Sequence, residues 1–291
     1  MARPESTIEE ALRKASFRLR EAGIERARDE AEYLLLSLWE GDRLKLFLQR
    51  SALLESALAG AFRTAVERRA RGEPLAYITG EKEFYGLNFT VNRKVLIPRP
   101  ESELLVDAVL EWARPKKEAI RGVDLGCGSG NLVVTLAHHL PEARFYAVDL
   151  SPEALTLAEA NARRHGVEKR VHFIRGDFLE AFTALEQPPR FNLIVSNPPY
   201  LRTEELEQLP RTIREYEPSL ALDGGPDGLE AYRNILAALP RFLRAPGMLA
   251  LEIGATQKGA LLSLCRGLSL FRRLTLQNDY QDLPRILTGL F

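Results

Sequence analysis

The chain has 291 residues, 45% of them hydrophobic and 27% charged, which is enough for two modest domains with apolar cores. Its 40 Lys and Arg balance 40 Asp and Glu, which argues against a protein that binds nucleic acid through phosphate contacts. Two isolated cysteines and four scattered histidines predict neither a metal site nor a disulfide framework. Because no apolar run reaches membrane-spanning length, we expect a cytoplasmic protein with no membrane partner.

The first 73 residues have the periodicity of amphipathic helices and predict a helical bundle. Ser6 and Glu9 have the spacing of a capping box at the start of the first helix. Apolar residues then recur at one-face spacing in the segments 8–19, 27–38 and 54–66. The mixed charges of this region are most simply explained as a solvated outer face.

Residues 74–97 predict a short β-hairpin connector, since Gly86 separates two runs of aromatic and aliphatic residues. From residue 98 to 291, strands and helices alternate, which predicts an α/β fold with a parallel sheet covered on both faces. Ser151 and Gly166 have the character of the N-cap and C-cap of one of these helices. The candidate strands are residues 120–125, 144–150, 171–175, 191–196 and 248–253, followed by an antiparallel pair at 271–278 and 284–287.

A glycine-rich loop ends the first of these strands and opens a helix. Its glycines allow a tight turn and the close approach of a ligand. The spacing is GxGxG instead of the GxGxxG of dinucleotide sites, and an acidic residue precedes it. A carboxylate repels pyrophosphate but suits the ammonium group of a methionine, so the pattern favours S-adenosylmethionine as cofactor and S-adenosylhomocysteine as product. The predicted cofactor residues of this loop are Asp124, Gly126, Cys127, Gly128, Ser129 and Gly130.

Acids also lie at the ends of the next two strands. Asp149 lies 23 positions after Gly126, where a carboxylate accepts hydrogen bonds from both ribose hydroxyls. Asp177 and Phe178 are placed to bind the adenine amino group and to stack on its ring. Taken alone, this pair is more simply a capping Asp and a core Phe. The three elements in this order favour a nucleoside site. Cys127 is expected to be a small loop residue, because nothing nearby supplies a base for a nucleophile.

The sequence Asn197-Pro198-Pro199-Tyr200 follows strand 191–196. A proline-rich turn is an ordinary feature, but this one ends a central strand on the same edge as the glycine loop. An amide nitrogen is a poor nucleophile because its lone pair is delocalised into the carbonyl. The Asn197 side-chain oxygen and the Pro198 carbonyl are placed to accept hydrogen bonds from its two N–H groups. These bonds stabilise the positive charge that develops on the nitrogen during methyl transfer.

The other residues of this turn have supporting roles in the prediction. Pro199 stiffens the turn, and Tyr200 offers a flat surface to a planar amide or base. Asn197 is also expected to border the cofactor. The sequence therefore predicts methyl transfer to a planar amide or amine nitrogen.

Several segments together carry a family resemblance. They are AYITG at 76–80, FYGLNF at 84–89, LIPRPESE at 96–103, the glycine loop, Asp149, residues 197–200 and Glu217-Pro218. The chain resembles the HemK or PrmC family, the peptide chain release factor glutamine N5-methyltransferases, whose PRPETE signature has Thr where this chain has Ser102. The resemblance implies a seven-stranded Rossmann-like methyltransferase sheet and methylation of the glutamine of the GGQ motif in release factors. It also implies an N-terminal bundle that docks this protein substrate.

Three positions depart from the family pattern. Asn192 stands where Asp is usual, Phe178 where Trp is common, and Met248 where a second glycine is usual. The first departure is expected to loosen the support of the 197–200 turn slightly. The other two change none of the roles assigned above.

Two other functions remain open. The NPPY sequence is shared with adenine-N6 DNA methyltransferases, so an enzyme that methylates exocyclic amines of DNA or RNA is the alternative of the same class. A cofactor-binding regulator without catalysis is the alternative of another class, and an intact Asn197 argues against it. We expect a monomer that binds no nucleic acid directly, with domains at 1–73, 74–97 and 98–291.

Overall fold

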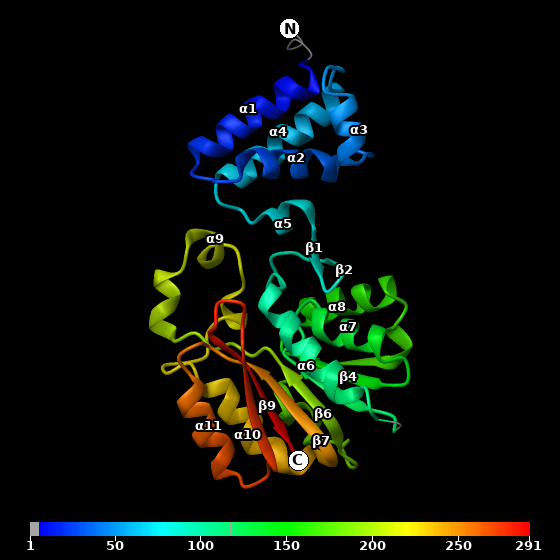
Figure 1. Cartoon of the computed structure of the whole chain (residues 1–291), viewed down its shortest axis with the longest axis vertical. Coiled ribbons are helices and arrows are strands. Elements are labelled where there is room, and N and C mark those ends of the chain that lie inside the picture. Colours follow the sequence, from blue (N-terminus) through cyan, green and yellow to red (C-terminus); the bar gives the residue numbers. More distant parts are fainter. Residues whose placement is uncertain (1–5, 117) are drawn as a thin grey trace. The chain divides into compact units, whose positions relative to one another are not determined.

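The structure is a computed structural model that describes residues 6–116 and 118–291. The chain divides into two compact units (Figure 1). The first contains the described residues up to Glu81 together with Pro210–Tyr216, and the second contains Lys82–Leu209 and Glu217–Phe291. The division after Glu81 falls inside the predicted connector, and residues 1–5 of the predicted bundle lie outside the described residues.

The first unit is a bundle of short helices around one apolar core. Leu12, Leu19, Leu34 and Leu35 are completely buried in this core, because one face of each long helix carries the apolar residues. The helices are α1 (Ile8–Glu21), α2 (Ala27–Leu38), α3 (Arg43–Leu48), α4 (Ser56–Ala70), α5 (Leu75–Thr79) and α9 (Arg211–Arg214).

The predicted capping box is wrong by one residue. The Thr7 hydroxyl accepts a hydrogen bond from the Glu10 N–H at 3.2 Å, and the Glu10 carboxylate accepts one from the Thr7 N–H. The Ser6 carbonyl accepts a hydrogen bond from the Leu54 N–H at 3.0 Å. This pairing holds Ser6 in an extended segment, so the helix begins one residue later than the sequence pattern indicated.

A two-stranded hairpin follows, made of β1 (Glu81–Phe84) and β2 (Leu87–Thr90). The two residues of its turn, Tyr85 and Gly86, have φ of +52° and +75°. Positive φ at both central positions is the geometry that joins two antiparallel strands with the least distortion of their twist. The hairpin therefore forms where Gly86 indicated it.

The second unit contains a seven-stranded sheet with the strand order β5-β4-β3-β6-β7-β9-β8. The strands from β5 to β7 run parallel, and β9 runs antiparallel to both of its neighbours. The predicted parallel sheet and its antiparallel closing pair are confirmed. The strands are β3 (Arg121–Leu125), β4 (Arg144–Asp149), β5 (Val171–Arg175), β6 (Phe191–Ser196), β7 (Leu243–Glu252), β8 (Arg273–Asn278) and β9 (Pro284–Leu290).

Helices cover both faces of this sheet (Figure 1), so the unit has two apolar cores. On one face lie α6 (Glu103–Ala113), α7 (Asn131–His139) and α8 (Pro152–Arg164); on the other lie α10 (Glu230–Phe242) and α11 (Lys258–Gly267). The predicted cap of α8 is present, since the Ser151 hydroxyl accepts a hydrogen bond from the Ala154 N–H at 3.1 Å. No helix in the described part of the chain is long and apolar enough to cross a membrane.

The order of the strands creates a crevice at one edge of the sheet. From β3 the chain adds β4 and β5 on one side, and then returns to place β6 on the other side of β3. Connections that leave two adjacent parallel strands in opposite directions open a crevice at their carboxyl ends, where ligands of such folds bind. The glycine loop follows β3 and the 197–200 turn follows β6, so both border this crevice.

Candidate functional site

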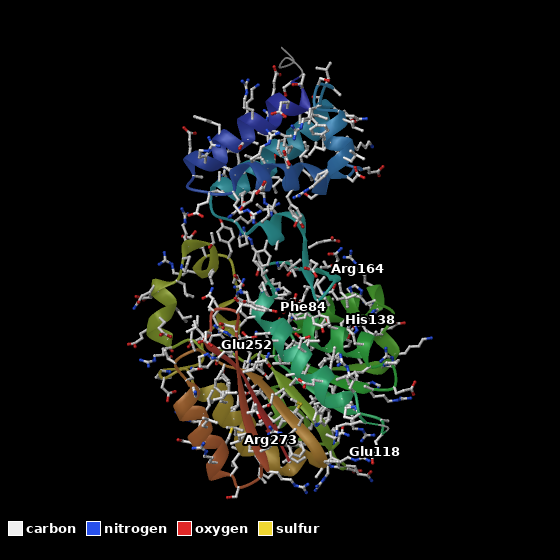
Figure 2. The ribbon with its side chains drawn as sticks, in the orientation of Figure 1. Phe84, Glu118, His138, Arg164, Glu252 and Arg273 are labelled. Atoms are coloured by element: carbon white, nitrogen blue, oxygen red, sulfur yellow. The ribbon has the colours of Figure 1, made fainter. Side chains whose placement is uncertain are left out.

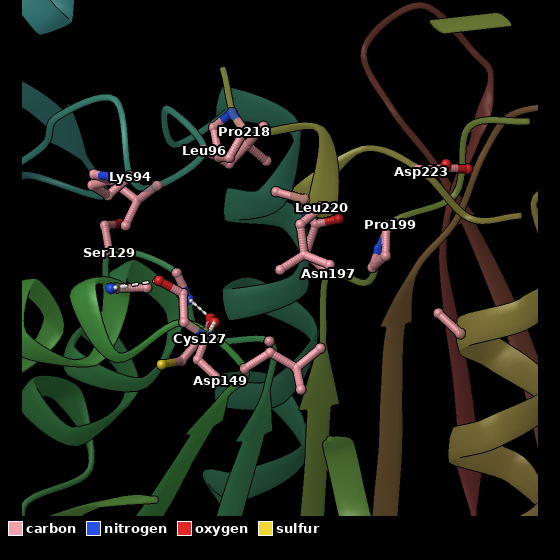
Figure 3. A pocket seen from close by; sticks show the side chains of 18 of the residues that line it. Lys94, Leu96, Cys127, Ser129, Asp149, Asn197, Pro199, Pro218, Leu220 and Asp223 are labelled. Carbon is pink, nitrogen blue, oxygen red and sulfur yellow. Dashed lines mark hydrogen bonds between the residues drawn. The ribbon is translucent and has the colours of Figure 1, made fainter. Parts of the chain in front are cut away.

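A cavity of about 740 Å³ lies at the carboxyl ends of β3, β4 and β6, within the second unit. Its volume is typical of a site for a cofactor-sized molecule. Figure 3 shows Cys127 and Asp149 on one side of it and Asn197 and Pro199 on the other. Of the predicted site residues, Gly126, Cys127, Gly128, Ser129, Asp149, Asp177, Phe178, Asn197 and Pro199 line the cavity. Asp124, Gly130, Pro198 and Tyr200 do not.

The glycine loop presents main chain to the cavity. Gly126 and Gly128 have φ of +75° and +55°, a left-handed conformation that residues with a Cβ rarely adopt. The N–H groups of Gly126 and Cys127 donate to the Val148 carbonyl at 2.8 and 3.0 Å, which ties the loop to the end of β4. Burial raises the pKa of the Cys127 thiol well above its ordinary value, which agrees with a packing role and not with a nucleophile.

Gly130 serves a different purpose from the other two glycines. A Cβ at this position would lie 3.0 Å from the Ala158 Cβ and 3.3 Å from the Ala158 Cα. The third glycine therefore allows the loop to pack closely against α8, and its place is beneath the cavity instead of on its surface.

The Asp149 carboxylate is held by two main-chain N–H groups. Its Oδ2 accepts from Gly128 at 2.8 Å and its Oδ1 accepts from Ser151 at 2.9 Å. Burial nevertheless raises the pKa of Asp149. Each carboxylate oxygen has a second lone pair, so this fixed carboxylate retains the capacity to accept two ribose hydroxyls.

Phe178 lies next to the glycine loop. It opens a short 3-10 helix (Phe178–Phe182) with φ of +41°, and a Cβ at Gly126 would lie 3.8 Å from its ring. The pKa of the neighbouring Asp177 is raised by partial burial. An aromatic ring, a fixed carboxylate and open glycine backbone within one cavity fit a nucleoside with a thioether or sulfonium chain. The contacts themselves remain predictions.

Asp124 is completely buried beneath the loop. Its Oδ2 accepts from the Val133 N–H at 3.2 Å, and its Oδ1 has no hydrogen-bond partner among the described residues. Desolvation by burial raises the pKa of Asp124 to about 7. Because Asp124 does not line the cavity, a direct contact with a methionine ammonium group stays a prediction.

The 197–200 turn is fixed to the glycine loop at its start. The Ser196 hydroxyl donates to the Leu125 carbonyl at 2.6 Å, which joins the last residues of β6 and β3. The Asn197 side chain lies immediately beyond this point, and its Nδ2 donates to the Ser102 Oγ at 3.1 Å. Within residues 6–116 and 118–291, no group donates a hydrogen bond to the Asn197 Oδ1. The carboxamide is thus held by its nitrogen, and its oxygen retains its accepting capacity.

Tyr200 is partly buried and is not among the residues that line the cavity. Its ring packs against the core beneath α10 and α11, and burial raises the pKa of its hydroxyl to about 12. Its carbonyl accepts a hydrogen bond from the Gln257 Nε2 at 2.9 Å. A Cβ at Gly224 would lie 2.8 Å from the Pro199 carbonyl oxygen, so glycine is needed there. Tyr200 secures the turn, and a contact with substrate remains a prediction.

An ion pair joins two segments that line the cavity. The Arg99 guanidinium donates to the Glu217 carboxylate at 2.6 Å, and Glu217 also accepts from the Ile97 N–H at 3.2 Å. Arg99 belongs to the PRPESE segment, and Pro218 and Leu220 follow Glu217 on the cavity wall. The sequence indicated both segments through resemblance alone and gave no reason for them to meet.

Asn161 is a further residue that sequence reasoning missed. It is completely buried in α8; its Nδ2 donates to the Ser129 carbonyl at 2.9 Å and its Oδ1 accepts from the Thr90 N–H at 2.8 Å. It therefore joins the glycine loop to the end of the hairpin. An amide between Ala158 and Ala162 on the apolar face of the helix was the available signal.

Asn192 lies at the opposite end of β6 from the turn, and its expected effect there stays a prediction. Asn192 is the second residue of β6, and its Oδ1 accepts from the Arg121 N–H at 2.8 Å. This bond joins the amino ends of β6 and β3, whereas the 197–200 turn lies at the carboxyl end of the sheet. Met248 is buried and pairs with Leu193 in the sheet.

The comparisons with known proteins agree with this geometry. A family model described as the PrmC N-terminal domain matches residues 10–80, and one described as a methyltransferase domain matches residues 116–256. A release factor glutamine methyltransferase of Moorella thermoacetica is 45% identical over 279 residues, which are 96% of each chain. One of Geobacter sulfurreducens is 43% identical over 258 residues, 89% of this chain and 88% of its own. The chain belongs to the release factor glutamine methyltransferase family.

The resemblance drawn from the PRPESE and NPPY segments is therefore confirmed. Solved structures show the same likeness at the level of the fold. The N-terminal domain of human METTL16, solved in complex with SAH, has a TM-score of 0.52 and 16% identity, covering 90% of this chain and 94% of its own. The human METTL16 catalytic domain has a TM-score of 0.56 and 15% identity, covering 81% and 82%. The predicted α/β methyltransferase fold is confirmed.

Proposed function

We propose that this chain transfers a methyl group from S-adenosylmethionine to the N5 amide nitrogen of the glutamine in the GGQ motif of peptide chain release factors. The observation that carries the proposal is the Asn197 carboxamide. It lines the cavity opposite the glycine loop, and its nitrogen is bound to the Ser102 Oγ. Membership of the release factor glutamine methyltransferase family supports the choice of glutamine as acceptor.

The residues of the turn meet the chemical demand of an amide acceptor. The Asn197 Oδ1 and the Pro198 carbonyl accept hydrogen bonds from the two N–H groups of the glutamine amide. These two hydrogen bonds draw the amide nitrogen towards a tetrahedral geometry. S-adenosylmethionine supplies an electrophilic methyl group: a carbon–nitrogen bond forms as the carbon–sulfur bond breaks, and S-adenosylhomocysteine leaves. The two acceptors stabilise the positive charge on nitrogen until a proton departs to water, and much of the remaining rate gain comes from alignment.

The same cavity supplies residues for the cofactor. We assign the ribose hydroxyls to Asp149, the adenine ring to Phe178 and its amino group to Asp177. We also assign the methionine part of the cofactor, which carries the sulfur, to the main chain of Gly126 and Gly128. Support comes from the fixed Asp149 carboxylate and from the left-handed glycines, which leave room where a Cβ would stand.

We assign docking of the protein substrate to the helical bundle. Three apolar side chains on α3 are largely exposed: Leu44 at 65%, Phe47 at 61% and Leu48 at 70%. Leu46 of the same helix is buried and anchors it to the bundle core. A group of exposed apolar side chains on one element is typical of a surface that contacts another protein. The proposed working form is a monomer that needs no nucleic acid.

The test is methyl transfer by the purified full-length chain from labelled S-adenosylmethionine. The substrate is a release factor with an intact GGQ motif, and its matched control has Glu in place of the motif glutamine, which removes the N–H bonds but keeps the shape. We expect label in the first protein alone, at the motif glutamine by mass spectrometry. Transfer to DNA or RNA in place of the release factor would support a base methyltransferase, and cofactor binding without transfer to any of them would support a regulator.

A further inference from the structure

A chain of buried hydrogen bonds leads away from the cavity behind Asn197. The Asn197 Nδ2 donates to the Ser102 Oγ at 3.1 Å, and the Ser102 hydroxyl donates to the Glu252 carboxylate. Ser102 and Glu252 are each 1% exposed. Asn197 follows β6, Ser102 ends the 3-10 helix Pro100–Ser102, and Glu252 ends β7, so three separate elements meet here. Figure 2 labels Glu252 at the end of its strand.

The chemistry of the three groups fixes the direction of this chain. An amide nitrogen donates and does not accept, so the Ser102 oxygen must be the acceptor for Asn197. The single hydroxyl proton of Ser102 is then free to go to Glu252, whose carboxyl oxygen Oε2 accepts it. If the Asn197 carboxamide turned over, its oxygen would face the Ser102 oxygen while the Ser102 proton was still directed at Glu252. Two acceptors would then face each other in a buried site, which is unfavourable.

The charged groups around Glu252 have other partners. Arg285 pairs with Asp279 at 3.0 Å, and Arg99 pairs with Glu217 at 2.6 Å. Glu101 is a further acid nearby. The Tyr232 hydroxyl donates to the main-chain carbonyl of Glu252 and not to its carboxylate. Among the described residues, the side-chain donor to the Glu252 carboxylate is Ser102.

We propose that Ser102 and Glu252 are positioning residues that hold the Asn197 carboxamide with its oxygen towards the acceptor amide. Glu252 acts through the proton that it accepts from Ser102, and Ser102 acts through the N–H that it accepts from Asn197. This inference rests on the proposed function, because it gives a purpose to the orientation of the group that binds the glutamine. It extends the site to the helix Pro100–Ser102, whose Ser102 lines the cavity, and to the buried end of β7.

A merely structural role for the pair would have a different signature. Ser102 joins the start of α6 to the end of β7, so its loss could simply loosen two elements. Loosening would lower stability and cofactor affinity together with turnover. A misdirected carboxamide lowers the rate of the chemical step and leaves the affinity for cofactor unchanged.

The experiment compares single-turnover methylation of a release factor by the full-length Ser102→Ala, Ser102→Thr, Glu252→Gln and Asn197→Ala variants and by the Ser102→Ala/Asn197→Ala double variant. Affinity for S-adenosylhomocysteine is measured by calorimetry in each. We expect Ser102→Ala to slow methyl transfer by about tenfold or more and to leave the affinity for S-adenosylhomocysteine unchanged. A misdirected Asn197 carboxamide loses part of the rate that is lost when the carboxamide is removed altogether. Ser102→Thr, which keeps the hydroxyl, should retain a rate close to wild type. Glu252→Gln should also slow transfer, because its amide no longer imposes one direction on the Ser102 proton.

The double variant decides whether the residues act through Asn197. Once Asn197 is Ala, there is no carboxamide to orient, so adding Ser102→Ala should cause little further loss of rate. Independent losses that multiply in the double variant would overturn the proposal, and so would a wild-type rate in both Ser102→Ala and Glu252→Gln. A wild-type rate in Asn197→Ala would overturn the proposed function of the turn instead, and the positioning role with it. If Ser102→Ala does not fold, Glu252→Gln alone and in a double variant with Asn197→Ala carries the same comparison.

Discussion

The Gly128 N–H donates to the Asp149 carboxylate at 2.8 Å, so the acid that is assigned to the ribose also shapes the glycine loop. Asp149→Ala should therefore weaken binding of S-adenosylhomocysteine by about 1.5–3 kcal/mol, the cost of losing hydrogen bonds to a charged group. Calorimetry measures this change. The control is Glu153→Ala, which removes an exposed acid from the same cavity wall and should leave the affinity as it is. An unchanged affinity in Asp149→Ala would remove the ribose assignment.

Because Gly130 packs closely against Ala158, a side chain at position 130 should lower stability without directly changing the cavity surface. Gly130→Ala must adopt φ near +78° and place a Cβ 3.0 Å from Ala158. Left-handed backbone costs about 1–2 kcal/mol and overpacking about 1–3 kcal/mol, so we expect a loss of about 2–5 kcal/mol in the free energy of unfolding. Gly166→Ala is the matched control, because Gly166 has φ of +68° and nothing within 4 Å. Equal losses in a denaturant titration would show that the contact with Ala158 is unimportant.

Asn197→Ala should lower kcat by about 10²–10³-fold, as for the loss of one preorganised group in a transition-state site. Cofactor affinity should change less, because the glycine loop and Asp149 carry most of that binding. Steady-state kinetics with a release factor and calorimetry with S-adenosylhomocysteine separate the two effects. A folded Asn197→Ala enzyme with the wild-type kcat would reduce the NPPY sequence to an ordinary turn.

The exposed apolar residues of α3 predict a substrate-specific defect. Leu48→Ser, at a side chain that is 70% exposed, should raise KM for the intact release factor and leave kcat and the fold unchanged. Turnover of a short GGQ peptide, which lacks the rest of the release factor, should be unaffected. Leu185→Ser is the control, since Leu185 is also exposed, at 48%, but belongs to the other unit. An unchanged KM in the α3 variant would place the docking surface elsewhere.

Glu252 predicts a pH-dependent contribution to stability. Burial raises the pKa of Glu252 from its ordinary value of 4.5 to about 7. In this interval the folded chain holds a proton that the unfolded chain releases, so stability falls as the pH rises from about 4.5 to about 7. Relative to wild type, Glu252→Gln should therefore gain at most about 3 kcal/mol of unfolding free energy between pH 4.5 and 7.5. Glu142→Gln, at an exposed acid, should show no such trend.

The sheet and its helices were predictable because their signals are local. A strand buried on both faces appears as a continuous apolar run, as in β6, and both β5 and β6 begin and end at the predicted residues. The cap at Ser151 has the same local origin. Ser6 and Thr7 are neighbouring residues that can both cap the first helix. The hydrogen bond between Ser6 and the distant Leu54 decides which of them does so, and the sequence pattern alone does not contain it.

The nucleoside side of the cavity was also predictable, since Gly126, Asp149 and Phe178 each lie at or just after the carboxyl end of a strand on the same edge. The support behind Asn197 was not. Ser102 lies 95 positions from Asn197 and 150 from Glu252 along the chain, and a hydrogen bond across such distances has no periodic signature. The available hint was Glu252 itself, an isolated acid in the apolar run that ends β7. Buried acids of this kind need a donor, but the sequence does not say which one.

The chain passes between the two units three times, after Glu81, before Pro210 and after Tyr216. The small segment Pro210–Tyr216 packs with the helical bundle, where the Tyr216 hydroxyl donates to the Arg71 carbonyl and Gly72 lies next to Thr212. The bundle is therefore not a detachable N-terminal module. A shortened chain that began at residue 82 would strand seven residues without their packing partners, and a gene fusion that exchanged only the first 81 residues between relatives would mismatch them. Recombination that preserves this protein has to carry both pieces together.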